Sequence, residues 1–169
     1  LISNGTAKCW GWNNSGRLGD GTTTDRLTPT AVTGRTNATA ITAGGTHTCA
    51  LPANRTVTCW GNKAYGHIAQ NTNVPRLAPT LVAGLSNVAA ITAGDTHTCA
   101  LTVGRTATCW GGNFAGELGD GTTTQRNVPS AVTGLTNATA TSSGDFHPCA
   151  TPNGTAKCWG WNDSGQLGD

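Results

Sequence analysis

Cysteines are the residues with the most evident chemistry in this chain of 169 amino acids, which contains seven of them. None forms the Cys-x-x-Cys spacing of a zinc or redox motif. Six fall into pairs that suit disulfides across a hairpin, which persist in oxidising compartments. The pairs are ten, ten and nine residues apart: Cys49 with Cys59, Cys99 with Cys109, and Cys149 with Cys158.

The hairpin tips support this pairing, because tip length and cysteine spacing change together. If Asn153-Gly154 forms a two-residue turn, Cys149 lies directly opposite Cys158. The other copies have three-residue tips, residues 53–55 and 103–105, which also place their cysteines opposite each other. Since a one-residue slip moves side chains to the other face of a sheet, the sequence predicts three disulfides. The alternative is facing pairs of buried free thiols.

Cys9 is left without a partner. By the same register its partner would lie two residues before Leu1, so we expect the native chain to continue upstream. A reactive or intermolecular thiol is the alternative.

Seven Asn-x-Ser/Thr sequons are candidate glycosylation sites and also point to a secreted protein. Asn, Ser and Thr are abundant here, so composition alone accounts for several of them, and in most bacteria they would carry no glycan. The acceptors are Asn4, Asn13, Asn37, Asn54, Asn137, Asn153 and Asn162.

Histidine and aspartate recur with the same period of fifty residues. His47, His97 and His147 are predicted to lie opposite glycines and to pack, rather than to act in catalysis or bind a metal. His67 lies outside this series and is expected to face solvent. The Leu-Gly-Asp-Gly-Thr segments predict turns in which the aspartate bonds the backbone, since no calcium-loop spacing is present.

No motif with the residues of an active site stands out from the repeat. There is no Ser/His/Asp arrangement, no carboxylate pair and no phosphate loop, so we expect no enzyme, no metal and no cofactor. The segment that departs most from the repeat is residues 63–71, the best local candidate for a distinct contact.

Tryptophan follows the second cysteine of every copy, which predicts a place in the core for Trp10, Trp60, Trp110 and Trp159. Other aromatic residues break the repeat and lie in Gly/Asn-rich loops, where they are candidates for contact with a protein or a glycan. These candidate binding residues are Trp12, Tyr65, Phe114 and Trp161.

Composition restricts the class of protein further. The net charge is +2 and the Lys and Arg residues are scattered along the chain, so nucleic-acid binding is not expected. No apolar run approaches the ~20 residues of a membrane span. Twenty-four glycines and the absence of helical periodicity favour short strands and turns.

Laid on itself at a shift of fifty, the chain divides into repeats 1–50, 51–100 and 101–150 and the start of a fourth, 151–169, in a single repeat domain. Each repeat predicts about four strands, in the first case near residues 30–32, 38–43, 47–51 and 56–60. The fold class is all-β, with four-stranded blades packed face to face as in a β-propeller.

The repeated motif His-Thr-Cys-Ala-Leu, then Cys-Trp-Gly-x-Asn-x-x-Gly-x-Leu-Gly-Asp-Gly-Thr, resembles the regulator of chromosome condensation repeat over essentially the whole chain. The resemblance implies a seven-bladed β-propeller, of which this chain holds about half. The cysteines differ from the intracellular members and resemble secreted bacterial and environmental versions.

We therefore expect an extracellular or cell-surface protein with a structural, adhesive or binding role. Half a ring leaves sheet edges and blade faces unpaired, so a homo-oligomer, polymer or filament is one form of that role. The resemblance also implies two alternatives, a guanine-nucleotide exchange factor for a small GTPase and a secreted enzyme inhibitor that uses the propeller face.

Overall fold

The computed structural model describes residues 5–34, 37–69 and 74–169. Within these residues the chain folds into thirteen strands and one short 3-10 helix, η1 (Ala64–Gly66). Of the described residues, no helix has the length and apolar character needed to cross a membrane.

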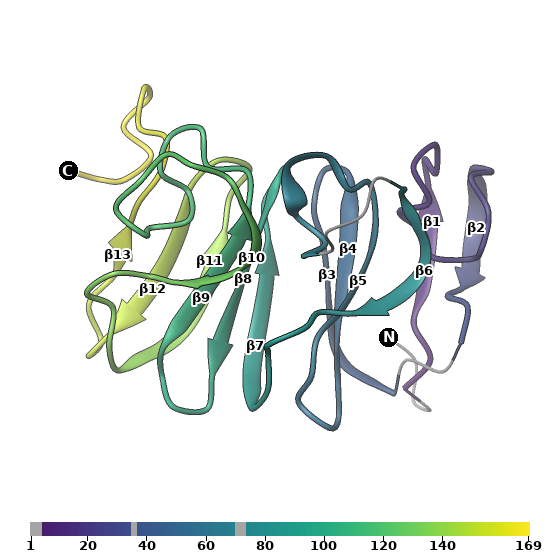
Figure 1. Cartoon of the computed structure of the whole chain (residues 1–169), viewed down its shortest axis with the longest axis horizontal. Coiled ribbons are helices and arrows are strands. Elements are labelled where there is room, and N and C mark those ends of the chain that lie inside the picture. The colour runs from purple at the N-terminus through teal and green to yellow at the C-terminus, as the bar shows by residue number, and fades with distance from the viewer. Residues whose placement is uncertain (1–4, 35–36, 70–73) are drawn as a thin grey trace.

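Four antiparallel sheets stand side by side along the molecule (Figure 1). The first contains β1 (Lys8–Gly11) and β2 (Arg26–Ala31). The second contains β3 (Ala38–Ala43), β4 (His47–Pro52), β5 (Thr58–Gly61) and β6 (Arg76–Leu81). The third contains β7 (Val88–Ala93), β8 (His97–Thr102), β9 (Ala107–Gly111) and β10 (Arg126–Ala131), and the fourth β11 (Ala138–Ser143), β12 (Pro148–Pro152) and β13 (Lys157–Cys158).

The blades are offset from the predicted grouping of strands. The strand expected near residues 30–32 is part of β2, which pairs with β1 in the first sheet and not with β3. In the same way β6 pairs with β5 and β10 pairs with β9, so each is the outer strand of the sheet that contains the preceding hairpin. A proline lies in each of these outer strands, where one N–H faces no further strand, and proline is tolerated at such an edge. These residues are Pro29, Pro79 and Pro129.

The hydrophobic core lies between the sheets, with one cluster of buried side chains at each of the three interfaces. Trp60 packs with Ala7 and Val32 at the first interface. Trp110 packs with Ile68 at the second, and Leu118 packs against Trp159 at the third. Trp10 has the same repeat position, but no sheet of the described residues covers it and it is 60% exposed, so the prediction of a core position is wrong for this residue.

The three predicted disulfides are present, and each joins the two central strands of a sheet. The pairs are Cys49–Cys59, Cys99–Cys109 and Cys149–Cys158, each with its Cα atoms 4.1 Å apart. The cysteines of each pair are direct partners in the strand register, as the tip lengths predicted. Cys49, Cys59, Cys99 and Cys109 are fully buried and belong to the core.

Two histidines of the repeat, His47 and His97, also lie where the register places them. His47 is opposite Gly61 and His97 is opposite Gly111, and both imidazoles are fully buried. The prediction for His67 is wrong, because this side chain is buried as well. Its ring packs on that of His47, with the ring centroids 4.4 Å apart, so the loop after β5 turns His67 inward between two sheets.

Candidate functional site

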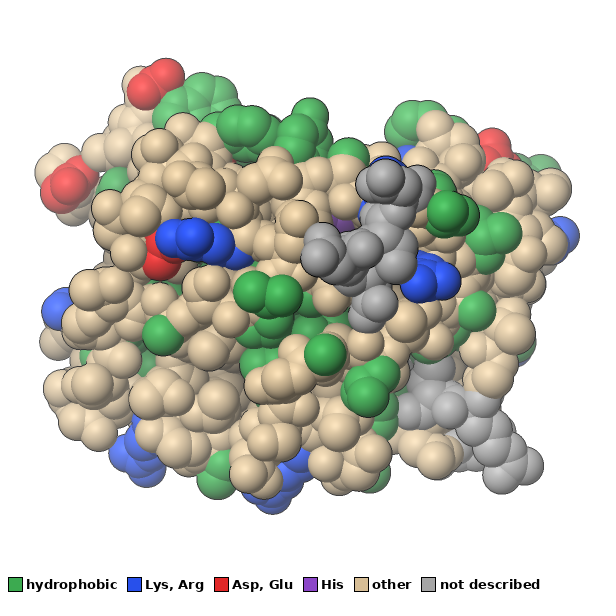
Figure 2. Space-filling model, in the orientation of Figure 1, with side chains coloured by type: hydrophobic (Ala, Val, Ile, Leu, Met, Phe, Trp, Pro, Cys, Tyr) green, Lys and Arg blue, Asp and Glu red, His purple; other side chains and the backbone are tan. Residues whose placement is uncertain are grey.

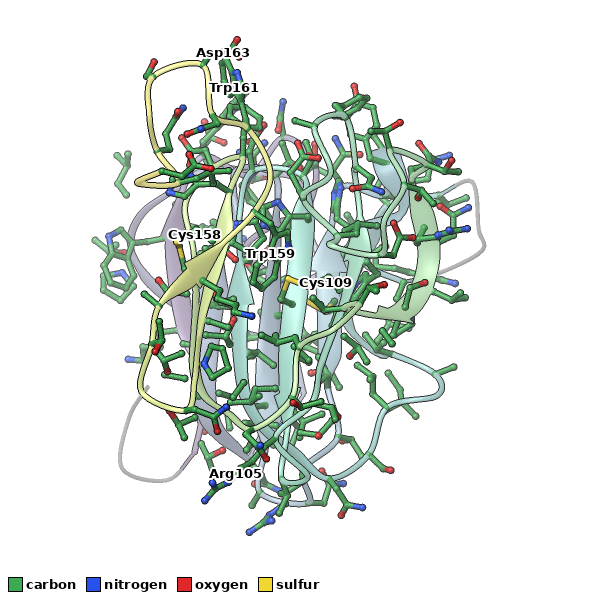
Figure 3. All side chains as sticks on the ribbon, turned by 90° about the vertical axis from the view of Figure 1, so that its left-hand side faces the viewer. Arg105, Cys109, Cys158, Trp159, Trp161 and Asp163 are labelled. Carbon is green, nitrogen blue, oxygen red and sulfur yellow. A yellow bond between two sulfur atoms is a disulfide. The ribbon has the colours of Figure 1, made fainter. Side chains whose placement is uncertain are left out.

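The molecule has two ends of different construction. One, here the loop end, carries the turns between the first and second strands of each sheet and the long loops that follow the third strands. The other, the tip end, carries the β-hairpin tips. Figure 3 shows Trp161 and Asp163 at the loop end and Arg105 at the opposite, tip end.

The loops of the loop end are held by a buried asparagine. The amide of Asn13 is fully buried and donates to the carbonyl oxygens of Thr22 and Thr24 at 3.0 Å each. Its Oδ1 accepts the backbone N–H of Leu18 at 3.0 Å. Asn113 makes the same set of bonds in the third repeat. These bonds give the loops a fixed shape from which neighbouring side chains project.

An aspartate completes each of these loops, as the sequence predicted. Asp20 accepts the backbone N–H of Thr22 at 3.0 Å and pairs with Arg26 at 2.7 Å, and Asp120 repeats both contacts. Burial raises the pKa of Asp20, but the hydrogen bonds from Thr22 and Arg26 outweigh it and lower the pKa to about 2. The carboxylate therefore stays charged and holds the loop through these contacts.

Aromatic side chains that are exposed or, for Phe146, half-buried project from this end of the molecule. Tyr65 and Phe114 come from loops of neighbouring sheets and make an edge-to-face pair with ring centroids 5.0 Å apart. Phe146 and Trp161 make a second pair at 5.2 Å, and the guanidinium of Arg17 lies 4.3 Å from the ring of Trp12.

The four predicted binding residues are thus all at the loop end, and Phe114 is 62% exposed. Figure 2 shows hydrophobic side chains gathered along this upper edge. Phe146 was missed, although the sequence holds a signal for it, since Thr46 and Thr96 occupy the same place in the other repeats. We call the five residues the aromatic rim: Trp12, Tyr65, Phe114, Phe146 and Trp161.

The segment that breaks the repeat, residues 63–71, is described as far as residue 69. Ile68 is fully buried in the place that Leu118 takes in the next repeat, so this part of the loop keeps the core contact. Tyr65 is the exposed aromatic side chain of the segment and has a left-handed backbone, with φ 64°. Residues 70 and 71 lie outside the described residues.

The sequons differ in their accessibility. Asn13 is unsuited to glycosylation in the folded chain, because its amide is buried and bonded within the loop. Asn162 uses its amide to donate to Asp169 at 2.8 Å. Asn4 lies outside the described residues. The exposed acceptors are Asn37, Asn54, Asn137 and Asn153.

Two further features of the described residues bear on chemistry, namely the thiol of Cys9 and the arrangement of potential metal ligands. Cys9 is a free, half-buried thiol that packs against the first interface, and burial raises its pKa. In the part of the chain that the structure describes, no group of three His, Cys, Asp or Glu side chains is arranged to hold a metal ion.

A family model of the regulator of chromosome condensation (RCC1) repeat matches residues 4–51, 56–101 and 109–151. A second model of the same repeat matches residues 38–66 and 88–117. No curated protein sequence matches the chain.

Solved structures share the fold. Human WBSCR16 is 26% identical, with a TM-score of 0.88 over 99% of this chain and 46% of that one. Yeast RCC1 (Prp20), solved bound to Kap60, is 21% identical, with a TM-score of 0.84 over 97% and 41% of the two chains. The receptor kinase CR4 ectodomain of Physcomitrella patens is 27% identical, with a TM-score of 0.59 over 96% and 36%. The chain therefore spans less than half the length of each of these chains.

Proposed function

The chain belongs to the regulator of chromosome condensation repeat family, and from this premise we propose that it is a non-catalytic, extracellular module that binds a protein partner through the aromatic rim. The observation that carries the proposal is the Tyr65–Phe114 pair, which joins the loops of two sheets while Phe114 stays 62% exposed.

The chemistry of the rim suits a protein surface. Aromatic side chains bring large contact area at a small loss of conformational entropy, and they are enriched among the residues that dominate binding energy. The loop that carries Phe114 is ordered before binding, because the buried amide of Asn113 fixes it. Pre-order lowers the entropic cost of binding. A yeast relative, Prp20, has been solved bound to a protein, Kap60.

The extracellular location is supported by the disulfides. Three of them in one chain are typical of an oxidising compartment, since cytosolic thiols are kept reduced. They also add stability where the core is thin and rich in alanine.

The test is a binding screen against an array of secreted proteins, cell-surface ectodomains and glycans. The rim variant is Tyr65→Ala/Phe114→Ala, and the control is Val128→Ala, which removes an exposed apolar side chain from the outer strand β10. We expect a protein ligand whose affinity falls about tenfold or more in the rim variant and stays unchanged in the control. Equal binding by both variants, or a ligand found only among the glycans, would contradict the proposal.

Guanine-nucleotide exchange on a small GTPase is the alternative that the family suggests, because the yeast relative Prp20p has been studied for its binding to Gsp1p. The disulfides count against a cytosolic role. A nucleotide-release assay decides between the two, since accelerated release by the oxidised protein would favour exchange. An enzyme inhibitor would use the same rim, and the array identifies it if the ligand is a secreted enzyme.

A structural role in an oligomer or filament is favoured by a different observation, the end sheet of β1 and β2 with Trp10 60% exposed. Light scattering coupled to size-exclusion chromatography separates a monomeric binding module from such an assembly. Restoration of the monomer by Trp10→Ser would place the contact at this sheet.

A further inference from the structure

Charge is divided between the two ends of the molecule. All eight acidic residues lie in the turns and loops of the loop end. In Figure 2 every visible acidic side chain is in the upper half, whereas Lys and Arg side chains are visible in both halves, including the lower edge. The acidic residues are Asp20, Asp25, Asp95, Glu117, Asp120, Asp145, Asp163 and Asp169.

The tip end carries cations alone. Arg55 and Arg105 are exposed at two neighbouring hairpin tips, and Lys8 and Lys157 begin strands at the same end. These residues are scattered in the sequence, but the period of fifty brings the two arginines to equivalent positions. The ion pairs of the described residues, Asp20 with Arg26 and its copy in the third repeat, are at the loop end. Neither of them neutralises the guanidinium group of Arg55 or Arg105.

A groove runs between the two tips. It has a volume of about 640 Å³ and is lined by Arg55 and Arg105, by hydroxyl groups, and by the aliphatic side chains of Leu51, Val88 and Leu101. No aromatic side chain lines it. The groove therefore combines two unpaired cations with an apolar floor.

The backbone at the two arginines favours glycine. Both have φ 61°, in the left-handed region where a side chain costs free energy. In the Asn-Gly-Thr tips of the other copies, Gly5 and Gly154 take this place, with φ 73° and 80°. The backbone carbonyl of Arg55 accepts the N–H of Val88, and the carbonyl of Gly5 accepts the N–H of Ala38, the equivalent residue of the repeat before. This hydrogen bond uses the backbone alone, so it does not require the arginine side chain. The backbone conformation therefore does not account for arginine at these two positions.

We propose that the groove at the tip end binds an acidic peptide segment of a partner protein. Carboxylates pair with the forked guanidinium groups of Arg55 and Arg105, and an aliphatic side chain of the peptide rests on Leu51, Val88 and Leu101. Nucleic acid fits less well, because few phosphates can be neutralised and no aromatic ring is present for a base to stack on. The site is separate from the aromatic rim, so it is a second binding surface.

The test measures binding of a fluorescent ten-residue peptide of alternating Glu and Leu by polarisation. A Gln/Leu peptide of the same length reports binding without carboxylates. The groove variant is Arg55→Gly/Arg105→Gly, which restores the residue of the other copies and is expected to keep the melting temperature. The matched control is Lys8→Gln/Lys157→Gln, which removes the same charge outside the groove.

We expect the Glu/Leu peptide to bind about tenfold or more tightly than the Gln/Leu peptide, and the groove variant to lose that difference. The control should retain affinity within about threefold, because exposed charges outside a site contribute little. Equal losses in both variants would show a general effect of charge and overturn the proposal, as would the absence of binding. Tighter binding of polygalacturonate or single-stranded DNA than of the peptide would also overturn it. Variants of Tyr65 and Phe114 leave this binding unchanged, so the result is independent of the aromatic rim.

Discussion

The indole Nε1 of Trp110 donates a hydrogen bond of 2.9 Å to the backbone carbonyl oxygen of His67. The bond recurs at 2.9 Å from Trp60 to the carbonyl of Arg17 and from Trp159 to that of Glu117. The acceptor residues carry side chains of different charge, so it is the backbone carbonyl that is required. The second, third and fourth sheets are thereby each attached to the loop of the sheet before, which explains the tryptophan after Cys59, Cys109 and Cys158.

Replacing Trp110 with Phe tests this attachment. The change removes the N–H donor and part of a fully buried ring, so we expect a loss of about 2–3 kcal/mol in the free energy of unfolding. The measurement is urea unfolding followed by circular dichroism. The matched control is Trp10→Phe at the same repeat position, where the side chain is 60% exposed and the loss should stay below about 0.5 kcal/mol. Similar losses at both positions would contradict the role of the bond.

The disulfides should contribute to stability individually. The double variant Cys99→Ala/Cys109→Ala opens a loop of ten residues, and the chain-entropy relation gives a loss of about 3 kcal/mol. Urea unfolding of the oxidised wild type and the variant measures it. Cys9→Ser leaves all three disulfides intact and should change stability little, because the thiol is only partly buried. A drop caused by Cys9→Ser as large as that of the double variant would argue against this reading.

The sequence predicted what depends on contacts within one hairpin. Strand register, disulfide pairing and the placement of His47 opposite Gly61 all follow from turn length and the period of two. It failed where a side chain depends on the next sheet. His67 looked like a solvent-facing loop residue, because the sequence does not show that its loop folds against β8 and β9.

The candidate site shows the same limit. Departures from the repeat pointed to the four predicted rim residues, but not to the edge-to-face pairing of Tyr65 with Phe114 across two sheets. The outer strand was assigned to the wrong blade, because pairing between strands far apart in sequence leaves no local pattern. The separation of charge was hidden for the same reason, since Arg55 and Arg105 are adjacent only once the repeats are stacked.

Gly94 is predicted to tolerate no side chain. A Cβ at this position would collide with the ring of His97, 2.7 Å from Nδ1, and would lie 2.7 Å from the carbonyl oxygen of Gly144. Gly94→Ala should therefore lower the free energy of unfolding by about 1–3 kcal/mol, as overpacking of a core does. Gly104→Ala is the control, because its Cβ would meet nothing closer than 3.5 Å, and thermal unfolding compares the two. Equal melting temperatures would show that the imidazole can move aside.

Glycosylation should distinguish the sequons if the protein is produced in a host that modifies them. Asn54 is exposed and should accept a glycan on its amide nitrogen. The bonds from Thr56 go to the amide oxygen, Oδ1, and do not involve this nitrogen. Asn13 should stay unmodified when folding precedes transfer, because its amide is buried and donates within the loop. Mass spectrometry of peptides after glycosidase treatment measures occupancy. Full occupancy of Asn13 in a folded, soluble product would be incompatible with the buried loop.

Stability should fall as the pH is lowered from 6.5 toward 4. Burial lowers the pKa of His47 well below 6.5, and burial lowers those of His67 and His97 to about 4. As the pH falls, the histidines therefore take up protons in the unfolded chain before they do so in the folded chain. The free energy of unfolding is largest above pH 6.5 and declines as the histidines of the unfolded chain become charged. Asp20 and Asp120, with pKa values lowered to about 2 from 3.8, contribute a further loss only below that window.

The variant His67→Gln isolates the histidine contribution to this decline. Glutamine keeps a polar group near the hydroxyl of Thr46, which lies 3.3 Å from Nε2 of His67, but it does not titrate. One unit of pKa shift corresponds to about 1.4 kcal/mol, so the variant should remove up to about 3 kcal/mol of the loss between pH 6.5 and 4. Urea midpoints at several pH values measure the slope for both proteins. A wild type whose stability is flat over this range, or a variant with an unchanged slope, would show that the buried rings do not control the acid response.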